Sequence, residues 1–225
     1  MGFLLYFVLL LIIPIWAQIK VKSAYSKYSK VASSSGMSGA EVARRILDDN
    51  GLFDVKIEEV QGQLTDHYDP RTKTVRLSSS NYHDHSIAGT SVAAHEVGHA
   101  IQDAEDYAFL RFRHALVPVA NIGSNFSFFI ILAGILFQAA DLLLLGIIFM
   151  AAAVLFQIVT LPVEFNASNR AMNQIVSLGI IRNEEEKHAR KVLNAAALTY
   201  VAAALVAVME LIRFVLMYVG MAREE

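Results

Sequence analysis

The sequence predicts an α-helical membrane protein with about four transmembrane helices and one small α+β polar domain. Hydrophobic residues make up 55% of the 225-residue chain, and the mean hydropathy of +0.45 is too high for an ordinary soluble domain. The apolar residues gather in four blocks instead of spreading evenly. The polar stretch between the first two blocks carries the signals of helices and short strands.

The first apolar block, residues 3–17, has no charged residue and is followed by lysines at positions 20, 22, 27 and 30. A signal peptide carries its positive charge before the apolar core and a cleavage site of small residues after it. Here the charge follows the core, and PIWAQIK is a poor cleavage site. We therefore expect a retained anchor over residues 1–19, with a cleaved signal peptide as the alternative.

The next two apolar blocks, residues 115–140 and 142–163, are separated only by Asp141. Each is long enough to cross a bilayer, since a spanning helix needs about 20 apolar residues. They predict a transmembrane hairpin over residues 115–163 with a tight turn.

The fourth block, residues 195–220, predicts a transmembrane helix within the C-terminal segment 195–225, although it contains Glu210 and Arg213. A charge at the middle of a membrane costs on the order of 3 kcal/mol, so these side chains should face protein or water. Residues three apart on a helix can meet. We expect a structural ion pair, with a functional role as the alternative.

Lysine and arginine are concentrated in two polar regions, residues 20–114 and 164–194. Loops rich in these residues stay on the cytoplasmic side of a membrane. We therefore expect a cytoplasmic domain at 20–114 and a cytoplasmic segment at 164–194 in a multi-pass protein of the cell membrane.

Composition also excludes some functions. The formal net charge is −2 and no run rich in lysine or arginine occurs, so we expect no nucleic-acid partner. The chain has no cysteine, so a bound metal must be held by histidine and carboxylate.

Within the polar domain, Ser38 followed by Glu41 forms a capping box and predicts the start of a helix that stops at Gly51. FDVKIEEV and RTKTVRLSSS alternate as strands do, and HYDPRTK between them predicts a turn. KTVRLSS is expected as an edge strand that holds an extended peptide, or as an ordinary edge strand.

The next helix of the polar domain, from near Ser86, carries the motif HEVGH. His95 and His99 lie one turn apart, where both imidazoles can reach one Zn²⁺ while Glu96 sits beside the water it activates. Gly98 would let another backbone or a substrate approach closely. The alternatives are a structural metal site, or core histidines bonded to backbone.

A catalytic zinc usually has three protein ligands. The candidates for the third are Asp103, Glu105, His114, Glu164 and the run Glu184 to Glu186. Glu164 differs from the others because the hairpin leaves just after the motif helix and must return beside it. We expect Glu164 to reach the metal.

Three stretches, HYDPRTKTVRLSSSNYH, VAAHEVGHAIQDA and LPVEFNAS, together resemble the YugP-type membrane zinc metallopeptidases and, more distantly, the HtpX- and Ste24-type membrane proteases. The resemblance covers nearly the whole chain, including the hairpin. It implies a gluzincin-like zinc-peptidase domain in which His95, His99 and Glu164 bind Zn²⁺ and Glu96 is the general base. It also implies cleavage of protein or peptide substrates by a bacterial membrane enzyme. Together with the lysine and arginine bias, we expect the site at the cytoplasmic face of the inner membrane, in membrane protein quality control.

The chain departs from the HtpX-type pattern at Ser168, where that pattern has aspartate. The group that orients a ligand histidine must then be Asp103 or a hydroxyl. No oxyanion-stabilising residue stands out among Arg170, Tyr82 and His83.

Two other classes of function stay open at this stage. One is a membrane adaptor whose zinc is structural, and the other is a carrier in which Glu210 and Arg213 line a path. The lipid bilayer is an expected partner in every case, and a membrane partner or a second copy of the chain is compatible with the sequence.

Overall fold

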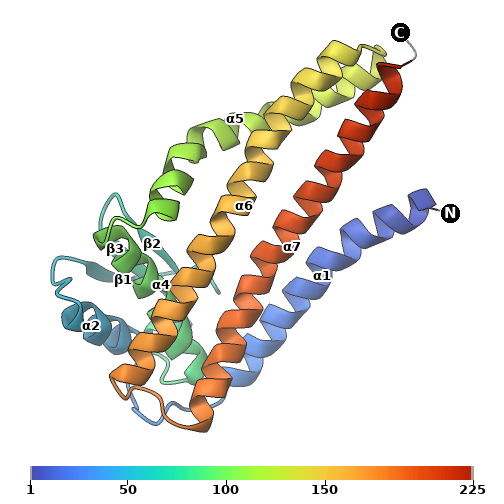
Figure 1. The fold of residues 1–225 in the computed structure, drawn as a ribbon. Helices are drawn as coiled ribbons and strands as arrows, with labels where there is room; N and C mark the ends of the chain where they lie inside the picture. The colour runs from blue at the N-terminus through green and yellow to red at the C-terminus, as the bar shows by residue number, and fades with distance from the viewer. Residues whose placement is uncertain (1, 224–225) are drawn as a thin grey trace. The chain divides into compact units, whose positions relative to one another are not determined.

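The structure is a computed structural model that describes residues 2–223, and Figure 1 shows its fold. Its elements are α1 (Gly2–Tyr28), α2 (Gly39–Asp49), β1 (Lys56–Val60), β2 (His67–Asp69), β3 (Thr74–Ser78), α3 (Ser79–His83), α4 (Ile87–Ala104), α5 (Ala108–Leu136), α6 (Ala140–Ser177) and α7 (Glu184–Met221). The chain divides into two compact units. The first comprises the residues up to Pro14, Ala108–Pro162 and the residues from Tyr200, and the second comprises Ile15–Tyr107 and Val163–Thr199. The domain boundaries expected from the sequence stay predictions.

Within residues 2–223, four helices are long and apolar enough to cross a membrane. They are α1, α5, α6 and α7, so the expectation of about four spanning helices is confirmed. A helix suits such a segment because it pairs every backbone polar group internally where lipid offers no partner.

The hairpin expected at 115–163 is formed by α5 and the first part of α6, but its turn is not at Asp141. The helices are separated by residues 137–139, where Gln138 has a φ of 52°, and Asp141 lies in the first turn of α6. A carboxylate is favourable there because the amino end of a helix carries partial positive charge. Gly134 brings the two helices together, since a Cβ on it would lie 2.6 Å from the backbone nitrogen of Leu143.

Glu210 and Arg213 form the expected ion pair, with Nη2 of Arg213 2.6 Å from Oε2 of Glu210. A third group joins them, because the hydroxyl of Tyr6 on α1 donates to Oε1 of Glu210 over 2.7 Å. The Arg213 guanidinium also lies 4.2 Å from the centre of the Phe214 ring. The polar groups within this apolar unit therefore connect α1 with α7.

The second unit is built around α4. Figure 1 shows α2 and the three strands gathered beside this helix, and both pack against it. The capping box expected for α2 is present, since Ser38 and Glu41 each accept a backbone N–H from the other residue. Val97 and Ala93 of α4 are fully buried in one core with side chains of α2, the sheet, α6 and α7.

The strands lie in the order β1-β3-β2, with β3 parallel to β1 and antiparallel to β2. KTVRLSS therefore contains the central strand, and the expectation that it is an edge strand is wrong. Residues 67–69, expected in a turn, form β2, which is one of the two edges.

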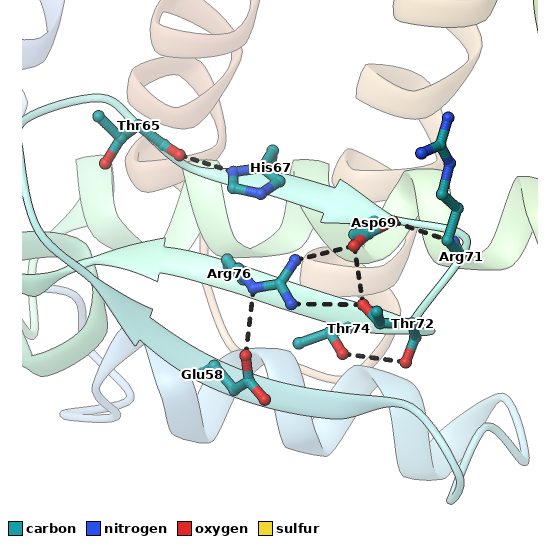
Figure 2. A network of polar contacts seen from close by, with 8 residues as sticks. All are labelled: Glu58, Thr65, His67, Asp69, Arg71, Thr72, Thr74 and Arg76. Atoms are coloured by element: carbon teal, nitrogen blue, oxygen red, sulfur yellow. Dashed lines mark hydrogen bonds and ion pairs between the residues drawn. The ribbon is translucent and has the colours of Figure 1, made fainter.

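Polar side chains connect the three strands of the sheet, as Figure 2 shows. Arg76 on β3 donates from Nε to Glu58 on β1 and from Nη1 to Asp69 on β2. Asp69 also accepts from the backbone of Arg71 and the hydroxyl of Thr72, which closes the turn between β2 and β3. These contacts hold β2 in register beside the central strand.

Candidate metal centre

The motif residues lie on α4, whose start is defined by Ser86. The Ser86 hydroxyl accepts the backbone N–H of Gly89, which satisfies one of the free donors at the amino end of the helix. One turn separates His95 from His99, and their ring centres lie 4.8 Å apart with an interplanar angle of 84°. Both imidazoles thus point to one side of α4.

Gly98 allows α6 to lie directly against this helix. A Cβ at Gly98 would lie 2.6 Å from the carbonyl oxygen of Ala167, closer than real Cβ atoms approach. The close approach expected at Gly98 is therefore made by the α6 backbone. It brings Glu164, one turn before Ser168 on α6, to the two histidines.

His95, His99 and Glu164 form a group that could hold a metal ion, with ligand atoms all within 4.8 Å of one another. Oε2 of Glu164 lies 3.3 Å from Nε2 of His95 and 3.6 Å from Nε2 of His99. Tetrahedral ligands about 2.0–2.1 Å from a zinc ion would be separated by roughly 3.3–3.5 Å. The donor set and the two distances from Glu164 therefore fit zinc, and the side chains are only 14%, 12% and 3% exposed.

Glu96 follows the first histidine and is 8% exposed. Burial raises the pKa of its carboxyl to about 7, and Asp66 and Glu164 add to the increase, whereas His95 and a hydrogen bond from the Tyr68 backbone oppose it. A divalent cation at the three ligands would lower this pKa again, because it favours the carboxylate.

Each histidine has a partner on the ring nitrogen that faces away from Glu164. Nδ1 of His95 lies 3.2 Å from the Ser168 hydroxyl, and Nδ1 of His99 lies 3.0 Å from Oε1 of Gln102. Of the two groups expected to orient a ligand, the hydroxyl contacts a histidine, whereas Asp103 accepts from the hydroxyl of Tyr68. Sequence reasoning missed Gln102, whose burial depends on the packing of α4 against α6.

The other candidates for the third ligand have different partners in the described part of the chain. Glu105 pairs with Arg170 at 2.6 Å, Glu184 pairs with Lys187 at 2.8 Å, and Glu185 accepts from Ser34. His114 lies on α5, in the first unit.

The three groups considered for oxyanion stabilisation also have contacts of their own. Arg170 bonds Glu105 and Asn166, His83 lies 3.1 Å from a Glu59 carboxylate oxygen, and Tyr82 packs partly buried against the core.

Comparisons with known proteins extend over nearly the whole chain. The model of a family described as "Putative neutral zinc metallopeptidase" matches residues 3–219. The chain is 58% identical over 205 residues to a protein of Bacillus subtilis (strain 168) named "Putative membrane protease YugP", and the match covers 91% of each chain. No solved structure matches. These findings confirm the resemblance to the YugP-type membrane zinc metallopeptidases that the three sequence stretches indicated.

Proposed function

Because the chain belongs to the family described as "Putative neutral zinc metallopeptidase", we propose that it is a membrane zinc endopeptidase whose metal is held by His95, His99 and Glu164, with Glu96 as general base. The observation that carries this proposal is the arrangement of the three ligand atoms, with Glu164 oxygen at 3.3 Å and 3.6 Å from the two imidazole nitrogens. The ligands come from two helices, and the Glu164 oxygen lies near tetrahedral distance from both histidines, in the gluzincin manner that the resemblance implies.

The residues of the site divide the chemistry between them. Zinc, when bound, supplies a Lewis acid that activates water and polarises a carbonyl group. Glu96 takes a proton from the attacking water on its carboxylate and delivers it to the nitrogen of the leaving amine. Burial favours the protonated form of Glu96 and a cation at the three ligands favours the carboxylate, and these opposed effects suit a group that must first accept the proton and then release it.

The edge of the sheet supplies a place for an extended substrate. Strand β2 is an edge strand, and the backbone of Tyr68 bonds the carboxylate of Glu96, so this edge lies beside the proposed general base. An extended peptide can pair with the backbone of an exposed edge while its side chains occupy alternate positions. Binding of an extended peptide, which the sequence assigned to KTVRLSS, is therefore assigned to β2.

We place the site at the cytoplasmic face of the bacterial inner membrane, with quality control of membrane proteins as the process served. The support is the concentration of lysine and arginine in the two polar regions and the exposure of Lys20, Lys22, Lys27 and Lys30 after the first apolar block. A membrane partner or a second copy of the chain stays compatible with these features.

The orientation can be tested directly because the native chain has no cysteine. Ser23 and Gly220 are exposed residues near opposite ends of apolar segments, and each can be replaced by cysteine in turn. A membrane-impermeant thiol reagent added to intact cells should label the variant at 220 and spare the variant at 23. The reverse pattern would place the site outside.

The proposed chemistry is tested with two variants. Purified wild-type protein should contain about one zinc ion, and Glu164→Ala should lose most of it because one of three protein ligands is gone. Glu96→Gln keeps the size of the side chain and the metal, and it should abolish hydrolysis of an unfolded protein substrate.

If Glu96→Gln hydrolyses the substrate as fast as wild type, the general-base assignment is wrong. If zinc is bound and neither protein shows hydrolysis, the adaptor with a structural zinc site is the better description.

A further inference from the structure

Gln102 is a fully buried polar residue on α4, and its side-chain hydrogen bonds all go to His99 or to the α6 segment that bears Glu164. Its Nε2 donates to the carbonyl oxygen of Val163 over 2.8 Å and to Oδ1 of Asn166 over 2.9 Å. Its Oε1 lies 3.0 Å from Nδ1 of His99. One amide thus contacts a proposed ligand on α4 and the residue just before a proposed ligand on α6.

The orientation of the Gln102 amide is fixed by neighbouring groups that can act only as a donor or only as an acceptor. A backbone carbonyl only accepts and a guanidinium only donates. Val163 therefore requires the amide nitrogen of Gln102 on its side, and Arg170, which donates from Nε to Oδ1 of Asn166 over 2.7 Å, requires that Asn166 present its oxygen. Both conditions turn the amide oxygen of Gln102 toward His99.

An amide oxygen only accepts, so Nδ1 of His99 must carry a proton. Neutral His99 is then held as the tautomer whose Nε2 has a free lone pair, and this nitrogen is the one that lies 3.6 Å from Glu164. A metal ligand needs that lone pair, and the partner of the other ring nitrogen decides which tautomer is present.

His95 has no such constraint. Its Nδ1 contacts the Ser168 hydroxyl at 3.2 Å, and a hydroxyl can either donate or accept. Its Nε2 lies 3.3 Å from the Glu164 carboxylate, which attracts a proton to that position when no metal is present. The two histidines of the motif are therefore held differently.

We propose that Gln102 is a positioning residue that holds His99 in its metal-binding tautomer and ties that ligand to the α6 segment bearing Glu164. The inference rests on the proposed function, since it concerns two of the three assigned ligands. Without Gln102, the Glu164 carboxylate would draw the His99 proton to Nε2, the position that zinc must occupy. Removing the hydrogen-bond partner of a metal-binding histidine typically lowers metal affinity about 10- to 100-fold, and we expect a loss of this size for Gln102→Met.

The tautomer can be read from the full-length protein in detergent by nuclear magnetic resonance after selective ¹⁵N labelling of histidine. Metal-free protein at alkaline pH, where the imidazoles are neutral, is compared with protein loaded with zinc. The His99 signals are assigned with His99→Gln. We expect His99 to carry its proton on Nδ1 in both forms, and His95 to carry it on Nε2 in the metal-free form.

Gln102→Met keeps an unbranched side chain of similar length and removes both the donor and the strong acceptor. We expect the His99 proton to move to Nε2 and the zinc dissociation constant, measured by chelator competition, to rise 10- to 100-fold. Asn166→Ala is the matched control, because Val163 alone still fixes the sense of the Gln102 amide. This control should leave the His99 tautomer unchanged.

A wild-type His99 protonated on Nε2 overturns the inference without any variant. The inference can therefore be refuted even if Gln102→Met fails to fold. A Gln102→Met protein with an unchanged His99 tautomer overturns it as well. If wild type shows the expected tautomers but binds no zinc, the proposed function fails while the hydrogen-bond assignment is supported. A purely structural role for Gln102 would lower thermal stability without changing the tautomer, and that result also counts against the inference.

Discussion

Gly98→Ala is the substitution whose effect on the metal centre follows most directly from the packing of α4 against α6. The added Cβ would lie 2.6 Å from the Ala167 carbonyl oxygen, and 3.1 Å and 3.2 Å from two further backbone atoms of that residue. Ordinary contact begins at 3.4 Å, so the two helices must separate there by about 0.8 Å. Backbone atoms cannot give way as the end of a flexible side chain does.

This displacement is large compared with what a metal site tolerates. Ligand distances in such sites hold within about 0.2 Å, whereas Glu164 lies on α6 less than one turn from Ala167 and must move with it. We expect the zinc affinity to fall at least tenfold, which corresponds to about 1.4 kcal/mol. Overpacking costs about 1–3 kcal/mol of stability, and the better helix propensity of alanine offsets about 1 kcal/mol of it. The net loss of stability is then about 0–2 kcal/mol, so the metal affinity should fall even where the fold is little destabilised.

Gly89→Ala on the same helix is the control, because a Cβ there would meet its nearest neighbours at an ordinary 3.5 Å. Gly89→Ala gains a similar helix propensity without a steric clash against a neighbouring backbone. Chelator competition gives the zinc dissociation constants, and thermal unfolding in detergent gives the stability of each protein. A Gly98→Ala protein that binds zinc as tightly as Gly89→Ala would refute the claim that this close approach sets the ligand spacing.

Three more predictions concern the ion pair, the sheet and the metal. Arg213→Leu should destabilise the protein in detergent or lipid on the order of 3 kcal/mol by leaving the Glu210 charge without its cationic partner, and the double variant with Glu210→Leu should recover most of it in a double-mutant cycle. Hydrogen bonds from Arg76 and Thr72 lower the pKa of Asp69 to about 2. The stabilisation they provide is therefore present above the unfolded-state pKa of about 3.9 and lost as pH falls toward 2, so acid unfolding of Asp69→Asn should depend less on pH in that range. Removal of zinc by a chelator should lower the melting temperature but leave the helix content, measured by circular dichroism, unchanged.

The features that the sequence predicts well are those set by local chemistry. The capping box of Ser38 and Glu41 needs only residues three apart, and the apolar runs need only length to predict spanning helices. HEVGH places two imidazoles on one side of a helix wherever that helix packs. Such features depend only on residues that are close together in the sequence, so the sequence alone is enough to predict them.

The features that sequence reasoning missed depend on distant partners. Whether β3 is central or at an edge is decided by its pairing with β1 and β2, which the alternation within one strand does not encode. Strand β2 is three residues long and precedes Pro70, so its sequence is typical of a turn. Its place in the sheet depends on Asp69 and Arg76, whose contact no local pattern predicts.

Gln102 was missed for a related reason. In the sequence it is one polar residue near the end of a helix, where a polar side chain is usually exposed to solvent and needs no partner. Its acceptors, Val163 and Asn166, lie 61 and 64 positions away on α6. Only the return of the chain after the hairpin shows that this side chain is buried between the ligand-bearing helices.

The contacts between α4 and α6 bear on whether the proposed zinc is catalytic or structural. A structural zinc supplies folding energy that the chain cannot otherwise provide, and such domains unfold when the metal leaves. Here the interface has independent support from the Gly98 close approach, the Gln102 bonds and the pairing of Glu105 with Arg170. The ligands are thus positioned by protein contacts, as expected for an ion that is kept for chemistry. Loss of helix content on chelation would reverse this argument and favour the adaptor.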